Sequence, residues 1–202
     1  MNTDSRLEKI LASGALAVTS ECGPPRGARP EKVKEKAALL KDHVDGINVT
    51  DNQTAMVRMS SFAAGIIIKQ MGLDPIMQMV ARDRNRLAMQ SDIIGAYAFG
   101  INTMLCLSGD HAKFGDHPMA QGVFDIDSVQ MINMVRRMRE EETFQGGAKI
   151  DGAPKMFIGA AANPFADPFE LRVMRLAKKV KAGVDFIQTQ CIFNLDKFEE
   201  WM

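Results

Sequence analysis

Short runs of apolar and β-branched residues recur along the 202-residue chain, and each run ends in polar side chains. We predict a strand at each of them, at residues 15–21, 46–52, 76–82, 103–110, 155–161 and 184–190. The segments between the runs have the apolar spacing of helices, at residues 30–40, 52–71, 84–99, 127–142 and 167–182. The chain therefore alternates strands with helices.

The strand ends recur about every 30 residues, the length of one strand, one crossover helix and their turns. Such alternation predicts a parallel sheet, either closed as a barrel or open as a doubly wound sheet. No GxGxxG phosphate loop follows the first strand, and nearly every strand ends in a hydrogen-bonding side chain. These side chains are Glu21, Asn52, Arg82, Asp110 and Gln190. We therefore predict an α/β fold of the (β/α)8 TIM-barrel type.

Six strand–helix units are fewer than the eight of such a barrel, which usually takes about 250 residues. We therefore expect residues 1–202 to form a single catalytic TIM-barrel domain, truncated at its C-terminus, with about six of the eight units present. The sheet should then be open between its first and sixth strands.

Composition narrows the class of protein. The 25 Lys and Arg residues balance the 25 Asp and Glu residues, so no general attraction to nucleic acid is expected. Two basic clusters, at residues 136–139 and 178–181, have helical spacing and predict solvated helix faces. No apolar run is long enough for a membrane span, and the N-terminus lacks the apolar stretch of a signal peptide.

The three cysteines fit neither a disulfide framework nor a CxxC metal motif, because Cys22, Cys106 and Cys191 lie far apart. We expect buried, reduced thiols in a cytoplasmic protein. His111 and His117 lack HExxH spacing, so we interpret them as polar loop residues and predict no metal site.

Three segments carry candidate chemistry. Glu21 ends the first strand before a Gly-Pro-Pro turn; if buried it could be a general acid, and otherwise it is an ordinary exposed carboxylate. Gly109 would let the backbone approach a flat or phosphorylated ligand, and Asp110 could pair with a heterocycle edge or cap a helix. Alternation places Gln188 and Gln190 on one strand face, where two amides are unusual for a barrel core and indicate ligand binding.

Seven segments, taken in order, resemble the methylenetetrahydrofolate reductase family. They are SECGPP, GINVTDN, QMVARDRNR, LCLSGDH, GDHPMAQGVFDIDS, GAAANPFADP and KAGVDFIQTQCIF. The resemblance runs from Glu21 to the C-terminus. It implies a flavin-dependent TIM-barrel oxidoreductase of one-carbon metabolism, which reduces 5,10-methylenetetrahydrofolate to 5-methyltetrahydrofolate for methionine biosynthesis.

The resemblance also implies roles for single residues. Glu21 matches the general acid of the family, which protonates the departing folate nitrogen. Asp110 matches the carboxylate between flavin and pterin, and Gln190 matches the amide that positions folate.

For the flavin, FAD or alternatively FMN, the resemblance implies a set of contacting positions. Three of them match the family: Thr50, Gly109 and Lys179. Three others depart from it: Ser108 stands where better-known members have Arg, Gln78 where many have His, and Asn163 where many have Tyr. These departures leave the choice between FAD and FMN open.

The electron donor implied by the resemblance is NADH, NADPH or a partner subunit. The ARDRNR and GDHPMAQGVFDIDS segments look more like members that a partner subunit supplies, and we expect an oligomer. Two rival readings are kept. One is a pterin-dependent methyltransferase barrel, which needs no flavin, and the other is a non-catalytic subunit of a one-carbon complex.

Overall fold

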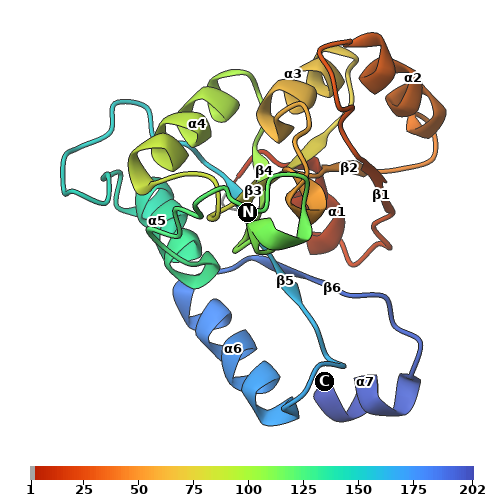
Figure 1. The fold of residues 1–202 in the computed structure, drawn as a ribbon, viewed down its shortest axis with the longest axis vertical. Coiled ribbons are helices and arrows are strands. Elements are labelled where there is room, and N and C mark those ends of the chain that lie inside the picture. The colour runs from red at the N-terminus through yellow and green to blue at the C-terminus, as the bar shows by residue number, and fades with distance from the viewer. Residues whose placement is uncertain (1–2) are drawn as a thin grey trace.

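The computed structural model describes residues 3–202, whose path is drawn in Figure 1. One parallel sheet holds six strands in chain order: β1 (Thr19–Cys22), β2 (Gly46–Val49), β3 (Pro75–Val80), β4 (Thr103–Leu107), β5 (Phe157–Ala162) and β6 (Phe186–Thr189). Seven α-helices accompany it: α1 (Arg6–Ala12), α2 (Glu31–Leu40), α3 (Ser61–Gln70), α4 (Arg86–Ala98), α5 (Ser128–Glu140), α6 (Phe169–Ala182) and α7 (Leu195–Trp201). Two 3₁₀ turns, η1 (Gln53–Ala55) and η2 (Ala112–Phe114), lie in the loops after β2 and β4.

The sheet is an open half-barrel. Within residues 3–202, β1 pairs with β2 and β6 pairs with β5, and the two outer strands do not meet. The predicted parallel sheet of six strands is confirmed, as is its opening between the first and sixth strands. Closure by eight strands stays a prediction.

Alternate side chains of each strand face the helices. Ile47, Met77, Met104 and Ile158 are fully buried on this outer face. Helices α2 to α6 follow one another in an arc along it (Figure 1). This packing explains why the strands read as short apolar runs in the sequence.

The inner face has a small apolar cluster near the amino ends of the strands, made by Ile76, Leu105 and Phe157 with Leu7 of α1. The hydroxyl groups of Ser5 and Thr103 are joined by a hydrogen bond of 2.7 Å, which ties the start of α1 to β4. Helix α1, which the apolar spacing did not predict, therefore covers the amino-end side of the sheet. The carboxyl ends of the strands are not covered by α1, and the candidate site lies there.

The predicted helix at 52–71 is wrong in its first half. Asn52, Thr54 and Ala55 have positive φ angles of 42°, 55° and 57°, a left-handed conformation that cannot continue a right-handed helix. Helix α3 begins only after Ser60, whose side chain accepts a hydrogen bond from the backbone N–H of Ala63. Spacing of apolar residues alone could not distinguish a strained loop from a helical turn.

Candidate active site at the carboxyl ends of the strands

The carboxyl ends of β3 and β4 border a cavity of about 270 Å³. Its lining includes five of the predicted site residues: Gln78, Ser108, Gly109, Asp110 and Gln190. They come from three strand ends that are distant in the sequence. The parallel sheet brings them together because all of its strands end at the same rim.

A second cavity, of about 410 Å³, shares Asp110 and Gln190 with the first. Side chains from the end of β5 and from α6 contribute to its lining: Asn163, Arg172, Arg175 and Lys179. Asn163 and Lys179 were predicted from the sequence, whereas the two arginines were not. Asp110 and Gln190 therefore lie at the junction of two cavities.

The two arginines belong to a cationic face of α6. Arg172, Arg175 and Lys179 follow each other at spacings of three and four residues, which places them on one side of a helix. This spacing was the signal in the sequence that could have identified the arginines. Arg172 donates to the carbonyl oxygens of Ala166 and Asp167, and no carboxylate pairs with Arg175 within residues 3–202. The face suits an anionic group.

Lys179 is buried, and this corrects the prediction that the basic cluster around it is a solvated face. Its ammonium group donates a hydrogen bond to the carbonyl oxygen of Ala161 on β5. Burial lowers the pKa of Lys179 below its ordinary value. The other basic cluster also has a buried member, Arg139, which pairs with Asp185 at 2.5 Å.

Glu21 lies at the same rim, on the edge strand β1, and is paired in register with Asn48 of β2. Its side chain is exposed and lines neither of the two cavities. Within residues 3–202, β1 pairs with β2 alone, and no strand covers its other edge. The burial that the general-acid interpretation requires is therefore absent here.

Polar atoms on and just after β2 are buried without partners. Thr50 Oγ1 and Asn48 Oδ1 are buried and have no hydrogen bond within the described chain. On the neighbouring strand, Gln78 lines the first cavity. An unpaired buried polar group costs about 1–3 kcal/mol, so such groups are usually completed by a ligand or by water. These residues fit a polar ligand held at the rim.

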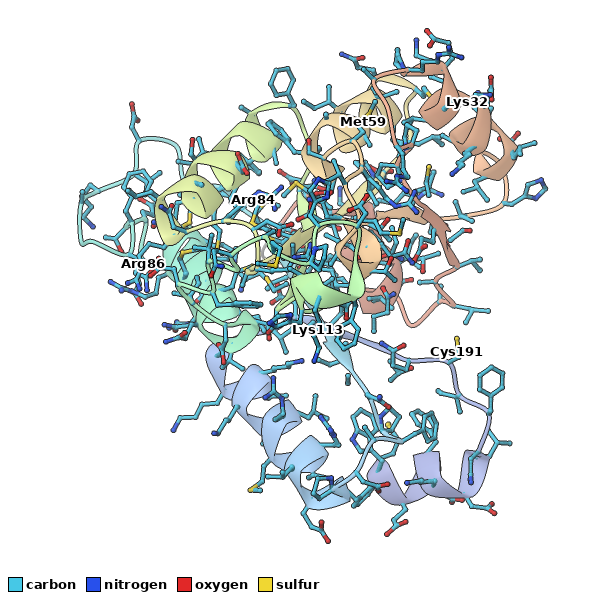
Figure 2. The ribbon with its side chains drawn as sticks, in the orientation of Figure 1. Lys32, Met59, Arg84, Arg86, Lys113 and Cys191 are labelled. Carbon is cyan, nitrogen blue, oxygen red and sulfur yellow. The ribbon has the colours of Figure 1, made fainter. Side chains whose placement is uncertain are left out.

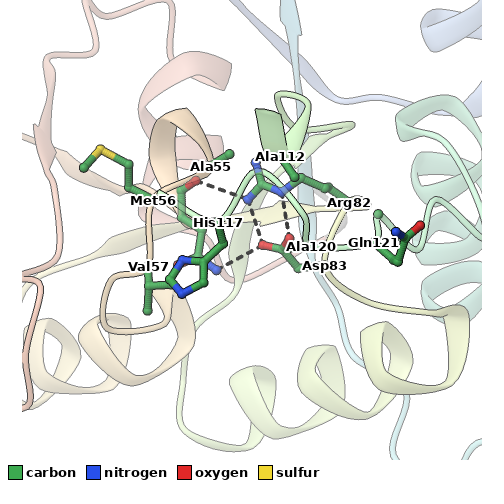
Figure 3. A pocket seen from close by; sticks show the side chains of 11 residues that line it. Ala55, Met56, Val57, Arg82, Asp83, Ala112, His117, Ala120 and Gln121 are labelled. Carbon is green, nitrogen blue, oxygen red and sulfur yellow. Dashed lines mark hydrogen bonds and ion pairs between the residues drawn. The ribbon is translucent and has the colours of Figure 1, made fainter. Parts of the chain in front are cut away.

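Arg82, at the end of β3, lines both the first cavity and a third cavity of about 260 Å³. Figure 3 shows its ion pair with Asp83. Arg82 Nε lies 2.7 Å from Asp83 Oδ1, and Arg82 Nη1 donates to the carbonyl oxygen of Asp110 at 2.9 Å. The hydrogen bond to Asp83 raises the pKa of Arg82. The sequence indicated Arg82 only as a strand-end residue, without this link to Asp110.

The cysteines divide into two groups. Cys22 and Cys106 are buried as predicted, and burial raises the pKa of Cys106 to about 12. The prediction is wrong for Cys191, which is exposed on the segment from β6 to α7 (Figure 2). This segment follows the edge strand β6, which pairs with β5 on one side and with no strand on the other within residues 3–202.

The loop histidines make local contacts. His111 caps η2, and His117 Nδ1 lies 2.9 Å from Asp116 Oδ1. Across residues 3–202, no three His, Cys, Asp or Glu side chains are grouped in a way that could hold a metal ion. In the same part of the chain, none of the helices is long and apolar enough to span a membrane.

Comparison with known sequences identifies one family. The family model for methylenetetrahydrofolate reductase matches residues 6–202. A curated relative from Caenorhabditis elegans, a probable methylenetetrahydrofolate reductase (NADPH), is 23% identical over 205 residues. That match covers 98% of this chain and 29% of the relative, so the chain spans less than a third of that protein.

Solved structures with the same fold include a protein from Clostridium thermocellum that binds two copies of 5-methyl-5,6,7,8-tetrahydrofolic acid. Its TM-score is 0.57 at 12% identity, over 96% of this chain and 62% of that one. A 2,3-dimethylmalate lyase has a TM-score of 0.61 at 12% identity, over 99% of this chain and 67% of that one. At such identities the likeness shows the fold alone.

Proposed function

The chain belongs to the methylenetetrahydrofolate reductase family, and from this membership we propose that it carries the catalytic barrel of a flavin-dependent reductase. The reaction we propose is the reduction of 5,10-methylenetetrahydrofolate to 5-methyltetrahydrofolate. The observation that carries the proposal is the position of Asp110 and Gln190 at the junction of two cavities. One cavity would take the flavin with its phosphate, and both residues would then face the ring system and the folate.

The residues of the rim fit a flavin. The cationic face of α6, formed by Arg172, Arg175 and Lys179, would hold its phosphate, because no carboxylate of residues 3–202 pairs with Arg175. The Gln78 amide, which lines the first cavity, would hydrogen-bond the polar ring edge of the flavin, and the unpaired Thr50 hydroxyl just after β2 would contribute a further hydrogen bond. Ser108, Gly109 and Asn163 complete the lining. We propose FAD, with FMN as the alternative; when bound, the flavin supplies the hydride for the methylene carbon.

Two carboxylates and one amide would act on the folate. Asp110 would bind the polar edge of the pterin, and Gln190 would orient the folate through its amide. Glu21 would hold the proton that the departing folate nitrogen takes up. This role requires that Glu21 lose its exposure, either when folate binds against it or when further chain covers β1.

For the donor of electrons we propose NADPH, which the name of the nematode relative contains, with a partner subunit as the alternative. A nicotinamide would use the same flavin face, so the site needs no separate nucleotide-binding motif. We further propose that the protein works in the cytoplasm as an oligomer.

The test is spectroscopic. We expect the purified full-length protein to be yellow, to bleach when NADPH is added without oxygen, and to regain its colour on addition of 5,10-methylenetetrahydrofolate. Bleaching by dithionite but not by NADPH would indicate a partner subunit as donor. A colourless protein that binds no added FAD or FMN would contradict the proposal and favour the methyltransferase reading.

A further inference from the structure

A continuous chain of hydrogen bonds joins the loop after Glu21 to the turn that carries Asp110. It begins at the carbonyl oxygen of Pro24, which accepts from Arg58 Nη1 at 3.0 Å. The backbone N–H of Arg58 in turn donates to Asn52 Oδ1 at 3.0 Å. The loop after β1 is thus tied to the loop after β2.

From Asn52 the series of hydrogen bonds continues to the ends of two more strands, β3 and β4. Asn52 Nδ2 donates to Asp83 Oδ2 at 3.0 Å, and that same carboxylate accepts two hydrogen bonds from Arg82, at 2.7 and 2.8 Å. Arg82 Nη1 then donates to the carbonyl oxygen of Asp110 at 2.9 Å. Every link is a direct contact between side chains or between a side chain and the backbone.

Asn52 lies at the centre of this series of hydrogen bonds and takes part in it through three groups. Its side-chain oxygen, its side-chain nitrogen and its carbonyl oxygen are each hydrogen-bonded, the last to Arg82 Nη2 at 3.2 Å. Its backbone is left-handed, with φ 42° and ψ 50°, a conformation that asparagine adopts more readily than most residues. Like glutamine, asparagine has a carboxamide that accepts at its oxygen and donates at its nitrogen.

The carboxylate of Asp83, within this series of hydrogen bonds, is balanced by the positive charges of Arg82 and Arg84. Burial raises the pKa of Asp83, but the hydrogen bonds from Arg82 and Asn52 and the charges of Arg82 and Arg84 outweigh burial and hold the pKa below its ordinary value. Asp83 is therefore an anion when it accepts from Asn52 and Arg82. A charged acceptor makes these links stronger than neutral ones.

We propose that Asn52 is a positioning residue that fixes the Glu21 loop and the Asp110 turn relative to each other. The inference rests on the proposed function, in which Glu21 gives a proton to the folate that Asp110 binds. Both groups must then be correctly placed about one substrate, and a displacement of about 1 Å can cost roughly 10²-fold in rate. Asn52 itself touches neither reacting atom.

Three variants distinguish the hydrogen bonds that lead from Asn52 toward Pro24 from those that lead toward Asp110. Asn52→Gly keeps the left-handed backbone and removes both side-chain links. Asn52→Asp keeps an acceptor for the N–H of Arg58 but loses the donor to Asp83 and places a second negative charge there. Arg58→Met removes only the link to Pro24. Asn85→Gly is the matched control, since Asn85 lies at the same rim and its side chain bonds Ala88 N alone within the described chain.

Amide hydrogen exchange of the full-length protein without ligand is the first measurement. In Asn52→Gly we expect exchange to accelerate about tenfold or more at both ends. Near Gly23 the reporter is the N–H of Met59, which donates to the carbonyl oxygen of Pro25, and around Gly109 the reporters are the N–H groups of Arg82 and Phe114, which donate to those of Ser108 and His111. In Asn52→Asp it should accelerate only around Gly109, and in Arg58→Met only around Gly23. Asn85→Gly should change neither. Unchanged exchange around Gly109 in both Asn52 variants would overturn the proposal.

The second measurement follows the two half-reactions by stopped flow. In Asn52→Gly we expect a fall of about 10- to 100-fold in the rate of flavin oxidation by the folate, with folate KM and flavin affinity within about threefold of wild type. A structural role alone would lower flavin content or raise KM instead, and that result would overturn the proposal. If the wild-type protein itself shows no folate half-reaction, the proposed function fails, and the exchange measurement still decides whether Asn52 couples the two loops.

Discussion

Gly109 lies so close to Val80 that a Cβ atom built on the glycine would be 3.1 Å from the Cβ of Val80. It would also be 3.1 Å from the Cβ of Arg82. The glycine has a φ angle of +89°, which most residues adopt only with strain. The turn that carries Asp110 therefore requires glycine for two separate reasons, its backbone conformation and its closeness to β3.

Replacing Gly109 with alanine should therefore destabilise the fold and shift Asp110. We expect a loss of about 2–4 kcal/mol in the free energy of unfolding, from a left-handed alanine and from overpacking against β3. Gly72→Ala is the control, because Gly72 has a φ angle of +79° and an added Cβ there meets nothing within 4 Å. It should lose about 1–2 kcal/mol. Equal losses in urea unfolding would show that the close approach to Val80 does not matter.

Replacing Glu21 with glutamine removes a transferable proton and keeps nearly the same shape. Flavin reduction by the donor needs no proton on folate, so we expect this half-reaction to be unchanged. The folate half-reaction should slow by about 10²–10⁴-fold, as for other enzymes that lose a positioned general acid. Stopped-flow measurement of both halves distinguishes them. A near-normal folate half-reaction would show that another residue is the general acid, with Asp110 the next candidate.

Lys179 should contribute to flavin affinity, and its neighbour Lys178 should not. Lys179→Met keeps an apolar stem in the buried position but removes the charge that lines the second cavity. We expect flavin binding to weaken about tenfold or more, the effect of losing roughly 1.4 kcal/mol. Lys178→Met, on an exposed position, should bind flavin like the wild type. Equal affinities of the two variants, measured by flavin fluorescence quenching, would contradict the assignment of the cationic face.

Asp125 should contribute stability that depends on pH. The side chain of Arg86 donates to it at 2.7 and 2.8 Å, and these hydrogen bonds, together with one from the backbone N–H of Arg86, lower the pKa of Asp125 from 3.8 to about 2. Because the folded state has the lower pKa, the contribution is complete above pH 4 and is lost as the pH falls from about 4 to about 2.

Asp125→Asn removes the titrating group. The difference in urea midpoint between the wild type and this variant should be constant from pH 7 to pH 5 and should shrink as the pH falls below 4. Asp4→Asn is a suitable control, since Asp4 is exposed and forms no ion pair within residues 3–202. A difference between wild type and Asp125→Asn that stays the same at pH 3 would show that the ion pair with Arg86 does not stabilise the fold.

Several features of the site were predictable because they depend on short stretches of chain. The polar ends of the strands identified Asp110 and Gln190, and the Ser-Gly-Asp turn after β4 indicated a close approach of the backbone. Once the strands are parallel, their carboxyl ends share one rim, so the cavity that Asp110 and Gln190 line follows from topology. The face formed by Arg172, Arg175 and Lys179 was also present in the spacing of the sequence, although it was not recognised there.

The sequence by itself determined the order of strands and helices and the polar rim, because alternation of buried and exposed positions is a local, periodic signal. Only the tertiary structure decided that Asn52, Thr54 and Ala55 are left-handed and that Glu21 is exposed on an edge strand. It also decided that Asn52, through Arg58 and Arg82, joins the loops of four strands. Such features depend on hydrogen bonds between residues far apart in the chain. Their partners become neighbours only when the strands have paired into one sheet, and the periodicity of a single segment does not specify which loop side chains then meet.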